Sequence, residues 1–132
     1  MTPNKTKPVI ENLKRKNILI VEDHPSLADI LRRIITAYGA RVSYVDSGNK
    51  ALTQVKRKPP DLILLDLSLP DMDGLEVATR LRQNENTKSV PILLMSASPN
   101  KKRECLRSGC NDFILKPFDI TELLARISRF MQ

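Results

Sequence analysis

Cysteine, histidine and aromatic residues are scarce in this chain. Its 132 residues include two cysteines, one histidine and no tryptophan. Cys105 and Cys110 are too few for a disulfide framework, and no histidine–cysteine cluster suggests a zinc site. A reducing cytoplasm is therefore the expected compartment, and both thiols are expected to be small buried side chains.

Long apolar runs are also missing. No run approaches the roughly 20 residues that a membrane-spanning helix needs. The basic N-terminus is not followed by an apolar stretch, so no secretory signal is expected. A hydrophobic content of 41% and a charged content of 28% are typical of a globular protein, and the length fits one domain.

The sequence lacks zinc-finger spacing, an aromatic-rich RNA-binding strand and a second helical module. Direct nucleic-acid binding is therefore not expected, although the net charge is +7. Residues 1–16 contribute to this charge with five basic side chains against one acid. We predict a basic N-terminal arm at residues 1–15, in which Val9, Ile10 and Leu13 could form one turn that docks, and one domain at residues 16–132.

The chain is organised around four apolar residues, Leu62 to Leu65, that end in Asp66. A short continuous apolar run favours a strand buried on both faces, as in a parallel sheet. The turn chemistry of Pro70 to Gly74 follows. Asp66 should thus lie at the carboxyl end of a central strand, where open α/β sheets bind ligands. Taken alone, an Asp in this place is more often the cap of a turn or a helix, and the rest of the chain reverses that preference.

Five strand patterns alternate with five helix patterns. We expect strands at residues 17–21, 41–45, 62–65, 90–95 and 112–115. Alternation predicts right-handed crossovers and a parallel sheet. The fold class is therefore α/β: a doubly wound five-stranded parallel sheet with helices on both faces, for which the flavodoxin-like strand order is 2-1-3-4-5.

Helix boundaries are also marked. Pro25 suits the first turn of the first helix, and Gly39 suits its end. Ser47 can cap the second helix, and Asp119 with Glu122 resembles a capping box for the last. The first helix shows an apolar face with spacings of three and four, formed by Leu27, Ile30, Leu31, Ile34, Ile35 and Tyr38.

Acids follow two strands that this order makes neighbours. Glu22 and Asp23 follow the first strand, and Asp66 ends the third. Three carboxylates at close range need a neutralising cation, and Mg²⁺ suits oxygen ligands beside a phosphate. Ser96 and Lys116 end the fourth and fifth strands at the same edge. A hydroxyl and an ammonium there are partners for phosphate oxygens.

With these residues placed, the chain resembles a response-regulator receiver domain of two-component signalling, similar to chemotaxis regulators. The resemblance covers about residues 16–131. It rests on Ile-Leu-Ile-Val-Glu-Asp at 18–23, Leu-Leu-Asp-Leu-Ser-Leu-Pro-Asp-Met-Asp-Gly at 64–74, Leu-Met-Ser-Ala at 94–97 and Asp-Phe-Ile-Leu-Lys-Pro-Phe at 112–118.

The resemblance implies that Asp66 is the phosphoacceptor. It would take a phosphoryl group from a phosphohistidine on a sensor histidine kinase or a histidine phosphotransfer protein, as in a phosphorelay. Mg²⁺ would be bound by Asp23 and Asp66, by Glu22 directly or through water, and by the backbone carbonyl of Ser68. The chain would be a signalling phosphoprotein rather than an enzyme, although it would assist its own phosphorylation and dephosphorylation.

The resemblance also implies a switch. Lys116 would pair with Asp66 and later with the acyl phosphate, and Ser96 would supply the switch hydroxyl. Phe113 matches the aromatic switch position and would turn inward, which remodels the face of the fourth helix, fifth strand and fifth helix. Lys116 and Pro117 would be joined by a cis peptide. A downstream protein would read this face; a phosphorylation-dependent homodimer stays open.

Other functions remain to be weighed. A receiver-like interaction module that does not use phosphate is the main alternative, and the intact site argues against it. Haloacid-dehalogenase-type phosphatases also use an Asp at a strand end, but they require a second acid two residues later. This chain has Ser68 at that distance from Asp66. A flavodoxin is disfavoured because the acids would repel a flavin phosphate. Ser68 and Ser98 offer no group that would orient water, so a long-lived acyl phosphate is expected.

Overall fold

One parallel sheet forms the centre of the protein. The computed structural model describes residues 12–131. Its five strands lie in the order β2-β1-β3-β4-β5, and every neighbouring pair is parallel. This confirms the predicted fold class and strand order. The strands are β1 (Asn17–Val21), β2 (Arg41–Val45), β3 (Leu62–Asp66), β4 (Ile92–Ser96) and β5 (Asp112–Leu115).

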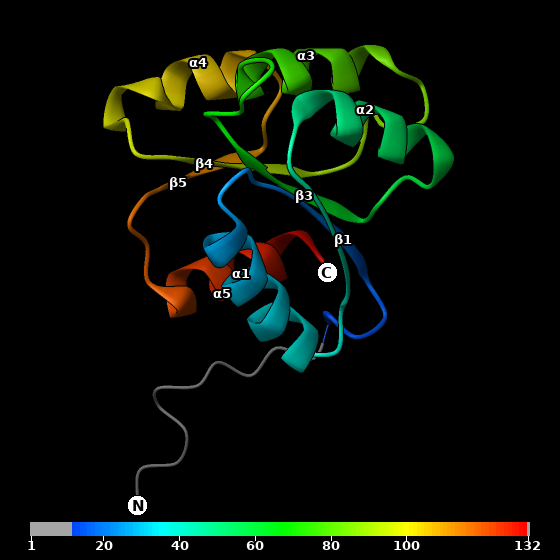
Figure 1. Ribbon diagram of the computed structural model, residues 1–132, viewed down its shortest axis with the longest axis vertical. Helices are drawn as coiled ribbons and strands as arrows, with labels where there is room; N and C mark the ends of the chain where they lie inside the picture. Colours follow the sequence, from blue (N-terminus) through cyan, green and yellow to red (C-terminus); the bar gives the residue numbers. More distant parts are fainter. Residues whose placement is uncertain (1–11, 132) are drawn as a thin grey trace, which may run out of the picture.

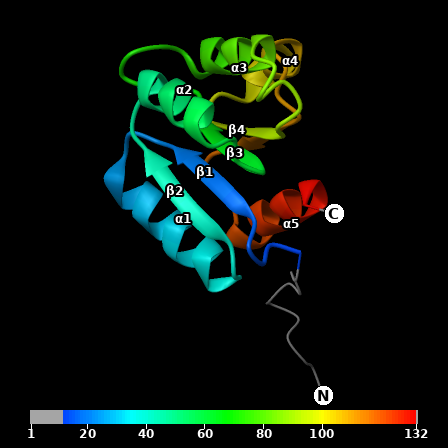
Figure 2. The same cartoon turned by 90° about the vertical axis from the view of Figure 1, so that its right-hand side faces the viewer.

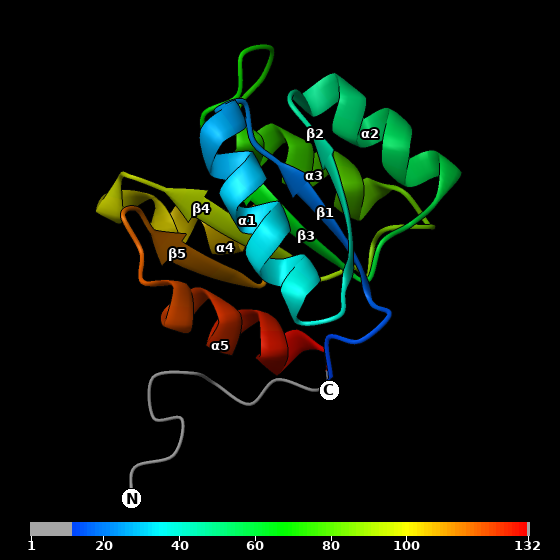
Figure 3. The same ribbon diagram turned by 60° about the horizontal axis from the view of Figure 1, so that its bottom comes forward.

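Helices cover both faces of the sheet. Figure 1 shows α2 (Gly48–Arg57), α3 (Gly74–Gln83) and α4 (Lys102–Arg107) on one side. The other side carries α1 (Pro25–Ala37) and α5 (Ile120–Phe130); in Figure 3, α1 lies in front of the sheet and α5 lies below it. A 3₁₀ turn, Pro99–Lys101, leads into the short α4. Within residues 12–131, no helix is both long and apolar enough to cross a membrane.

Strand β3 separates two apolar cores. All five of its residues are buried. Leu62 and Leu64 pack towards α1 and α5, while Ile63 and Leu65 pack towards the other helices. Because side chains alternate along a strand, a continuous apolar run can fill both cores at once. Asp66 is the first polar residue of this run, and it marks the edge of the sheet.

The helix ends follow the sequence signals closely. Ser47 accepts a hydrogen bond from the Lys50 backbone N–H at the start of α2. Asp119 caps α5 through the Thr121 N–H. The predicted return bond from Glu122 is not the one observed, because its carboxylate accepts instead from Arg126 at 3.0 Å. The expected capping box is thus only half formed.

Helix α1 differs from the prediction at one residue. Ile30 was expected on the buried face, but it is 50% exposed. The buried stripe consists of Ala28, Leu31 and Ile35, and Ile30 lies one residue, about 100° of helical rotation, from Leu31. Figure 2 shows α1 packed beside β1 and β2 near the edge of the sheet. A helix there needs only a narrow apolar stripe, so its flank can carry an exposed isoleucine.

The described chain begins with a turn that packs on the domain. Leu13 is completely buried in the core between the sheet, α1 and α5. Asn12 and Ser128 exchange two hydrogen bonds, at 2.9 and 3.1 Å. Of the docking turn predicted for Val9, Ile10 and Leu13, the docking of Leu13 is confirmed, while Val9 and Ile10 lie outside the described residues. The rest of the predicted arm, residues 1–11, lies outside the described residues, and the boundary at residue 16 stays a prediction.

Candidate functional site

Three carboxylates meet at the carboxyl edge of the sheet. Val21 of β1 pairs with Leu65 of β3, so the residues that follow each strand are neighbours. Ligand atoms of Glu22, Asp23 and Asp66, together with one nitrogen of His24, lie within 4.8 Å of one another. The expected strand order was enough to predict this acidic cluster, because neighbouring parallel strands end at the same edge of the sheet.

Lys116 joins two of these acids. Its ammonium donates to Asp66 Oδ1 at 2.9 Å and to Glu22 Oε1 at 3.0 Å. The Glu22 side chain is fully buried, and Asp66 is 3% exposed. The side chain of Lys116 remains 20% exposed. Buried carboxylates are costly unless they are paired, so this ammonium offsets much of the cost. The contact between Lys116 and Glu22 was not predicted.

Burial and the hydrogen bonds of Lys116 shift the pKa values of Asp66 and Lys116 in opposite senses. Burial raises the pKa of Asp66, the hydrogen bond from Lys116 lowers it, and the charge of Glu22 raises it again, with a net upward shift. Burial lowers the pKa of Lys116, but its hydrogen bonds to Asp66 and Glu22 outweigh burial and leave that pKa raised. The lysine therefore stays charged at neutral pH.

The second oxygen of Asp66 is free for chemistry. Among residues 12–131, the buried atom Asp66 Oδ2 has no hydrogen-bond partner, and Asp23 Oδ1 has only the His24 ring nitrogen 3.3 Å away; Asp112 Oδ2, outside this cluster, is also unpartnered. Unsatisfied buried oxygens are rare in folded proteins, and a bound ion or water is one explanation for them. Carboxylate oxygens are the ligands that Mg²⁺ prefers. The donor set therefore fits a divalent cation.

His24 is a neighbour of the site that the sequence analysis left without a role. Its Nδ1 lies 3.0 Å from Glu22 Oε2 and 3.3 Å from Asp23 Oδ1, and the side chain is largely exposed. The hydrogen bond to Glu22 raises the pKa of His24, and the charge of Asp23 adds to the effect. The position of His24 directly after two acids in the sequence was the signal that could have predicted this contact.

The remaining predicted residues lie around this cluster. Ser96 ends β4, is buried, and accepts the Ser98 backbone N–H at 3.0 Å. Phe113 is 7% exposed, so its ring already lies inward, and its role as the aromatic switch stays a prediction. The peptide bond between Lys116 and Pro117 is cis. Ser68 is exposed just after β3, and the role of its carbonyl stays a prediction.

The loop after Asp66 is anchored by contacts that the sequence did not reveal. The Asp71 carboxylate accepts the backbone N–H groups of Gly48 and Asn49, at 2.9 and 2.8 Å, and so caps α2 from a distant loop. These bonds lower the pKa of Asp71. At the other end of the loop, a Cβ on Gly74 would lie 2.5 Å from the Asp66 carbonyl oxygen. Glycine thus permits α3 to begin against the backbone of Asp66.

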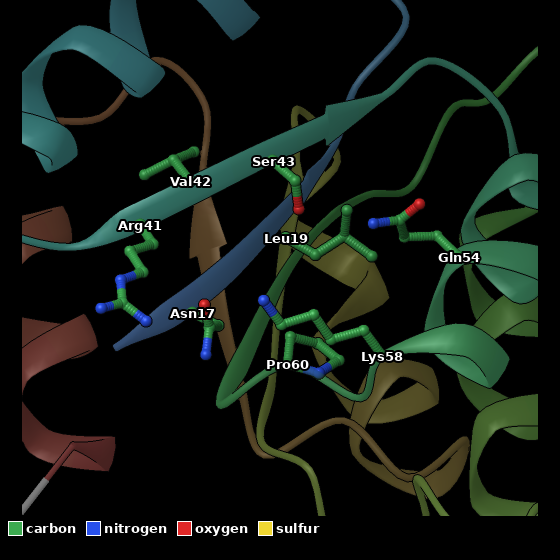
Figure 4. A pocket seen from close by; sticks show the side chains of 8 residues that line it. All are labelled: Asn17, Leu19, Arg41, Val42, Ser43, Gln54, Lys58 and Pro60. Atoms are coloured by element: carbon green, nitrogen blue, oxygen red, sulfur yellow. The ribbon is translucent and has the colours of Figure 1, made fainter. Parts of the chain in front are cut away.

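A separate polar hollow lies between β2 and α2. It has a volume of about 220 Å³, and Figure 4 shows the side chains that line it. Asn17 and Arg41 are the first residues of β1 and β2, so the hollow lies towards the amino ends of these strands. The acids follow the opposite ends. The hollow is therefore no part of the acidic cluster.

Comparison with known sequences gives one consistent family. The family described as the response regulator receiver domain matches residues 18–128. The DNA-binding response regulator MtrA of Mycolicibacterium smegmatis is 39% identical over 115 residues, which are 86% of this chain and 49% of MtrA. The regulator RpaA of Synechocystis is 36% identical over 117 residues, 87% of this chain and 48% of RpaA. The chain thus spans about half the length of these curated relatives.

Solved structures agree with the sequence comparison. Chemotaxis protein CheY4 of Vibrio cholerae has a TM-score of 0.83 at 28% identity, with 88% of this chain and 98% of that chain covered. The receiver domain of the sensor histidine kinase PA1611 from Pseudomonas aeruginosa has a TM-score of 0.82 at 33% identity, with 89% and 98% covered. That structure holds a magnesium ion in its active-site cleft. This chain belongs to the response regulator receiver domain family.

Proposed function

We propose that this receiver domain is a phosphorylation switch in which Asp66 accepts a phosphoryl group from a phosphohistidine. The observation that carries the proposal is that the two carboxylate oxygens of Asp66 differ in their hydrogen bonding. Oδ1 is bonded to Lys116, whereas Oδ2 is buried and unpartnered. An oxygen in this position can attack phosphorus without first breaking a hydrogen bond, and the other oxygen keeps the carboxylate oriented.

The transfer needs little covalent chemistry from the protein. Asp66 Oδ2 forms a bond to phosphorus while the bond to the histidine nitrogen of the donor breaks, and the nitrogen leaves with its electron pair. Charge then builds on the phosphoryl oxygens, and catalysis depends on positioning and charge stabilisation. Lys116 can stabilise this charge, because its ammonium is already within 3.0 Å of the Asp66 carboxylate.

The acidic cluster would hold the divalent cation of the reaction. We assign Asp23 and Asp66 as direct ligands, Glu22 as a direct or water-mediated ligand, and the Ser68 backbone carbonyl as the fourth contributor. A bound Mg²⁺ would neutralise charge on the phosphoryl oxygens. Glu22 is also held by Lys116 and by the backbone N–H of His24, at 3.0 and 3.2 Å. These contacts favour the water-mediated role for Glu22.

The switch would run from Ser96 to the outer face of α4, β5 and α5. Ser96 Oγ accepts the Ser98 N–H, so its own hydroxyl hydrogen is left to donate to a phosphoryl oxygen. Leu106 of α4 and Leu115 of β5 are 48% and 43% exposed, which makes this face suitable for a protein partner. We propose that signalling passes to that partner and that this chain does not itself bind nucleic acid.

A partner that brings the phosphohistidine would dock beside Lys116. An apolar hollow of about 370 Å³ adjoins this lysine, between the start of α1 and the loop before α5. It is lined by Leu27, Ala97, Pro117, Phe118 and Ile120. Apolar contact there and charge contact at the acids suit a helix of a sensor histidine kinase or a histidine phosphotransfer protein. The cytoplasmic location stays a prediction.

The test is intact-mass analysis after incubation with acetyl phosphate. We expect one phosphoryl adduct that requires Mg²⁺, disappears with EDTA, and is absent from Asp66→Ala. Asp71→Asn is the matched control, because it alters an acid of the same loop that caps α2 and does not face the site. This variant should keep the adduct.

The outcomes separate the switch from its alternative. A folded protein that binds Mg²⁺ but takes no phosphoryl group from acetyl phosphate would restrict the donor to a phosphohistidine protein. A folded protein that binds neither would favour the phosphate-independent interaction module. An adduct that survives in Asp66→Ala would place the acceptor elsewhere and refute the assignment.

A further inference from the structure

The two cysteines meet at the C-terminal end of α4. The backbone N–H of Cys110 bonds to the Cys105 carbonyl at 3.1 Å, and the Gly109 N–H bonds to the Leu106 carbonyl at 3.2 Å. Gly109 has a φ of +102°. This pair of bonds around a left-handed glycine is the Schellman motif. The motif brings together the side chains three residues before and two residues after the helix cap, which here are both cysteines.

The two thiols share one buried environment. Both lie in the core on the α2, α3 and α4 side of the sheet, and each thiol shifts the pKa of the other. An ordinary Schellman motif places two apolar side chains here. Two thiols satisfy the same contact but add chemistry, because adjacent thiols can be oxidised to a disulfide.

The two thiols are not equivalent. Cys110 is 5% exposed, and the Arg82 guanidinium lies next to it, since Arg82 Nε donates to the Gly109 carbonyl at 2.8 Å. The neighbouring Cys105 thiol lowers the pKa of Cys110, and the charge of Arg82 lowers it further against the effect of burial. Cys105 is fully buried and donates weakly to the Asp112 carbonyl at 3.7 Å. Thiolate character and access therefore favour Cys110 as the attacking sulfur.

We propose that Cys105 and Cys110 form a redox modification site that a hydroperoxide converts into an intramolecular disulfide. The Cys110 thiolate attacks one peroxide oxygen, the O–O bond breaks, and a sulfenic acid forms on Cys110. The Cys105 sulfur then attacks the Cys110 sulfur and displaces its oxygen as water. With hydrogen peroxide as the oxidant, the two thiols lose two protons and two electrons in total, and two molecules of water form.

This disulfide would tie α4 to β5. Cys105 belongs to α4, and Cys110 is two residues before Asp112, the first residue of β5. The bond would also remove the thiol hydrogen that Cys105 donates to Asp112. Oxidation would thus fasten one side of the proposed partner-binding face without a change at the acidic cluster. The proposal stands independently of phosphorylation at Asp66.

The experiment treats the folded, reduced protein with hydrogen peroxide and then alkylates the free thiols in denaturant. We expect intact mass to show the loss of two hydrogens and no alkyl groups, and a reductant to restore both alkylation sites. Peptide mapping should link Cys105 to Cys110, and Asp66→Asn should behave identically. Hydrogen exchange at the Cys110 amide should become slower in the oxidised form.

Single variants assign the attacking sulfur. Cys105→Ser should trap a sulfenic acid on Cys110 that reacts with dimedone, whereas Cys110→Ser should leave Cys105 reduced. The reverse pattern would overturn the assignment. Thiols that remain fully alkylatable after peroxide, links between molecules, or sulfinic acids would overturn the proposed site and leave the pair as an ordinary apolar contact.

Discussion

The start of α3 lies close against the backbone of Asp66, so Gly74→Ala is a sharp test of the site geometry. A Cβ at this residue would lie 2.5 Å from the Asp66 carbonyl oxygen and 2.9 Å from Leu67 Cα. Ordinary Cβ contacts begin near 3.4 Å, so β3 and the start of α3 must separate by about 0.9 Å. Neither neighbour is a flexible side chain that could move aside.

The magnitude follows from two opposing terms. Overpacking of this kind costs about 1–3 kcal/mol. Alanine also stabilises by about 0.4–1 kcal/mol, because it restricts the unfolded chain, and Gly74 shows no left-handed φ that would forbid alanine. We expect a net loss of about 1–2 kcal/mol in the free energy of unfolding. A displacement near 1 Å at a reacting group can lower a rate about 100-fold, so phosphorylation should slow markedly.

Gly48→Ala is the matched control. Gly48 also begins a helix, and its added Cβ would meet Met72 Cγ and Val77 Cγ2, which are side-chain atoms. Methionine repacks readily, so this variant should lose less stability and keep its phosphorylation rate. Urea unfolding and the time course of the phosphoryl adduct measure both effects. A Gly74→Ala protein as stable and as reactive as the wild type would refute the close-packing argument.

Three further predictions concern the charged site and its product. Lys116→Gln should lower the free energy of unfolding by about 3 kcal/mol at neutral pH, because it leaves the buried carboxylates of Glu22 and Asp66 unpaired. This loss of stability should shrink in acid, where Asp66 is protonated. An undiminished loss in acid would contradict this cause. His24 should titrate above its ordinary pKa of 6.5 by NMR, and Glu22→Gln should lower that pKa. Because the pKa of His24 is raised in the folded protein, His24 stabilises the fold at pH values below 6.5, and this contribution disappears as the pH rises through the pKa of the folded state. An unshifted pKa of His24 would contradict this pH dependence. The acyl phosphate should be long-lived, and Ser68→Asn should shorten its half-life by offering an amide to orient water; a wild-type half-life of seconds would disprove the first expectation.

Local signals predicted most of the fold. The strand of Leu62 to Asp66 could be read from its apolar run, because both faces of a central strand face a core. The cap at Ser47 could be read from its residue type, since a hydroxyl before a helix has a nearby N–H to accept. The acidic cluster followed from topology, because parallel strands bring Glu22, Asp23 and Asp66 to one edge.

Contacts that depend on side-chain reach could not be predicted in the same way. The strand order places Lys116 near the acids, but it does not say that one ammonium can span both Glu22 and Asp66. Asp71 caps a helix that precedes it by more than 20 residues, and no local pattern announces this contact. Ile30 shows the opposite limit, because periodicity marks a broad apolar face while packing decides how much of it is covered.

The turn at the start of the described chain has a practical consequence for anyone who shortens or fuses this protein. A cut at residue 16, where the motifs begin, would remove Leu13 from a closed core and the Asn12 contacts from the last turn of α5. Loss of a buried leucine side chain costs about 2–5 kcal/mol, a large part of the stability of a small domain. A truncated or fused protein should therefore keep residues 12–16, or a failure to fold would be mistaken for a failure to signal.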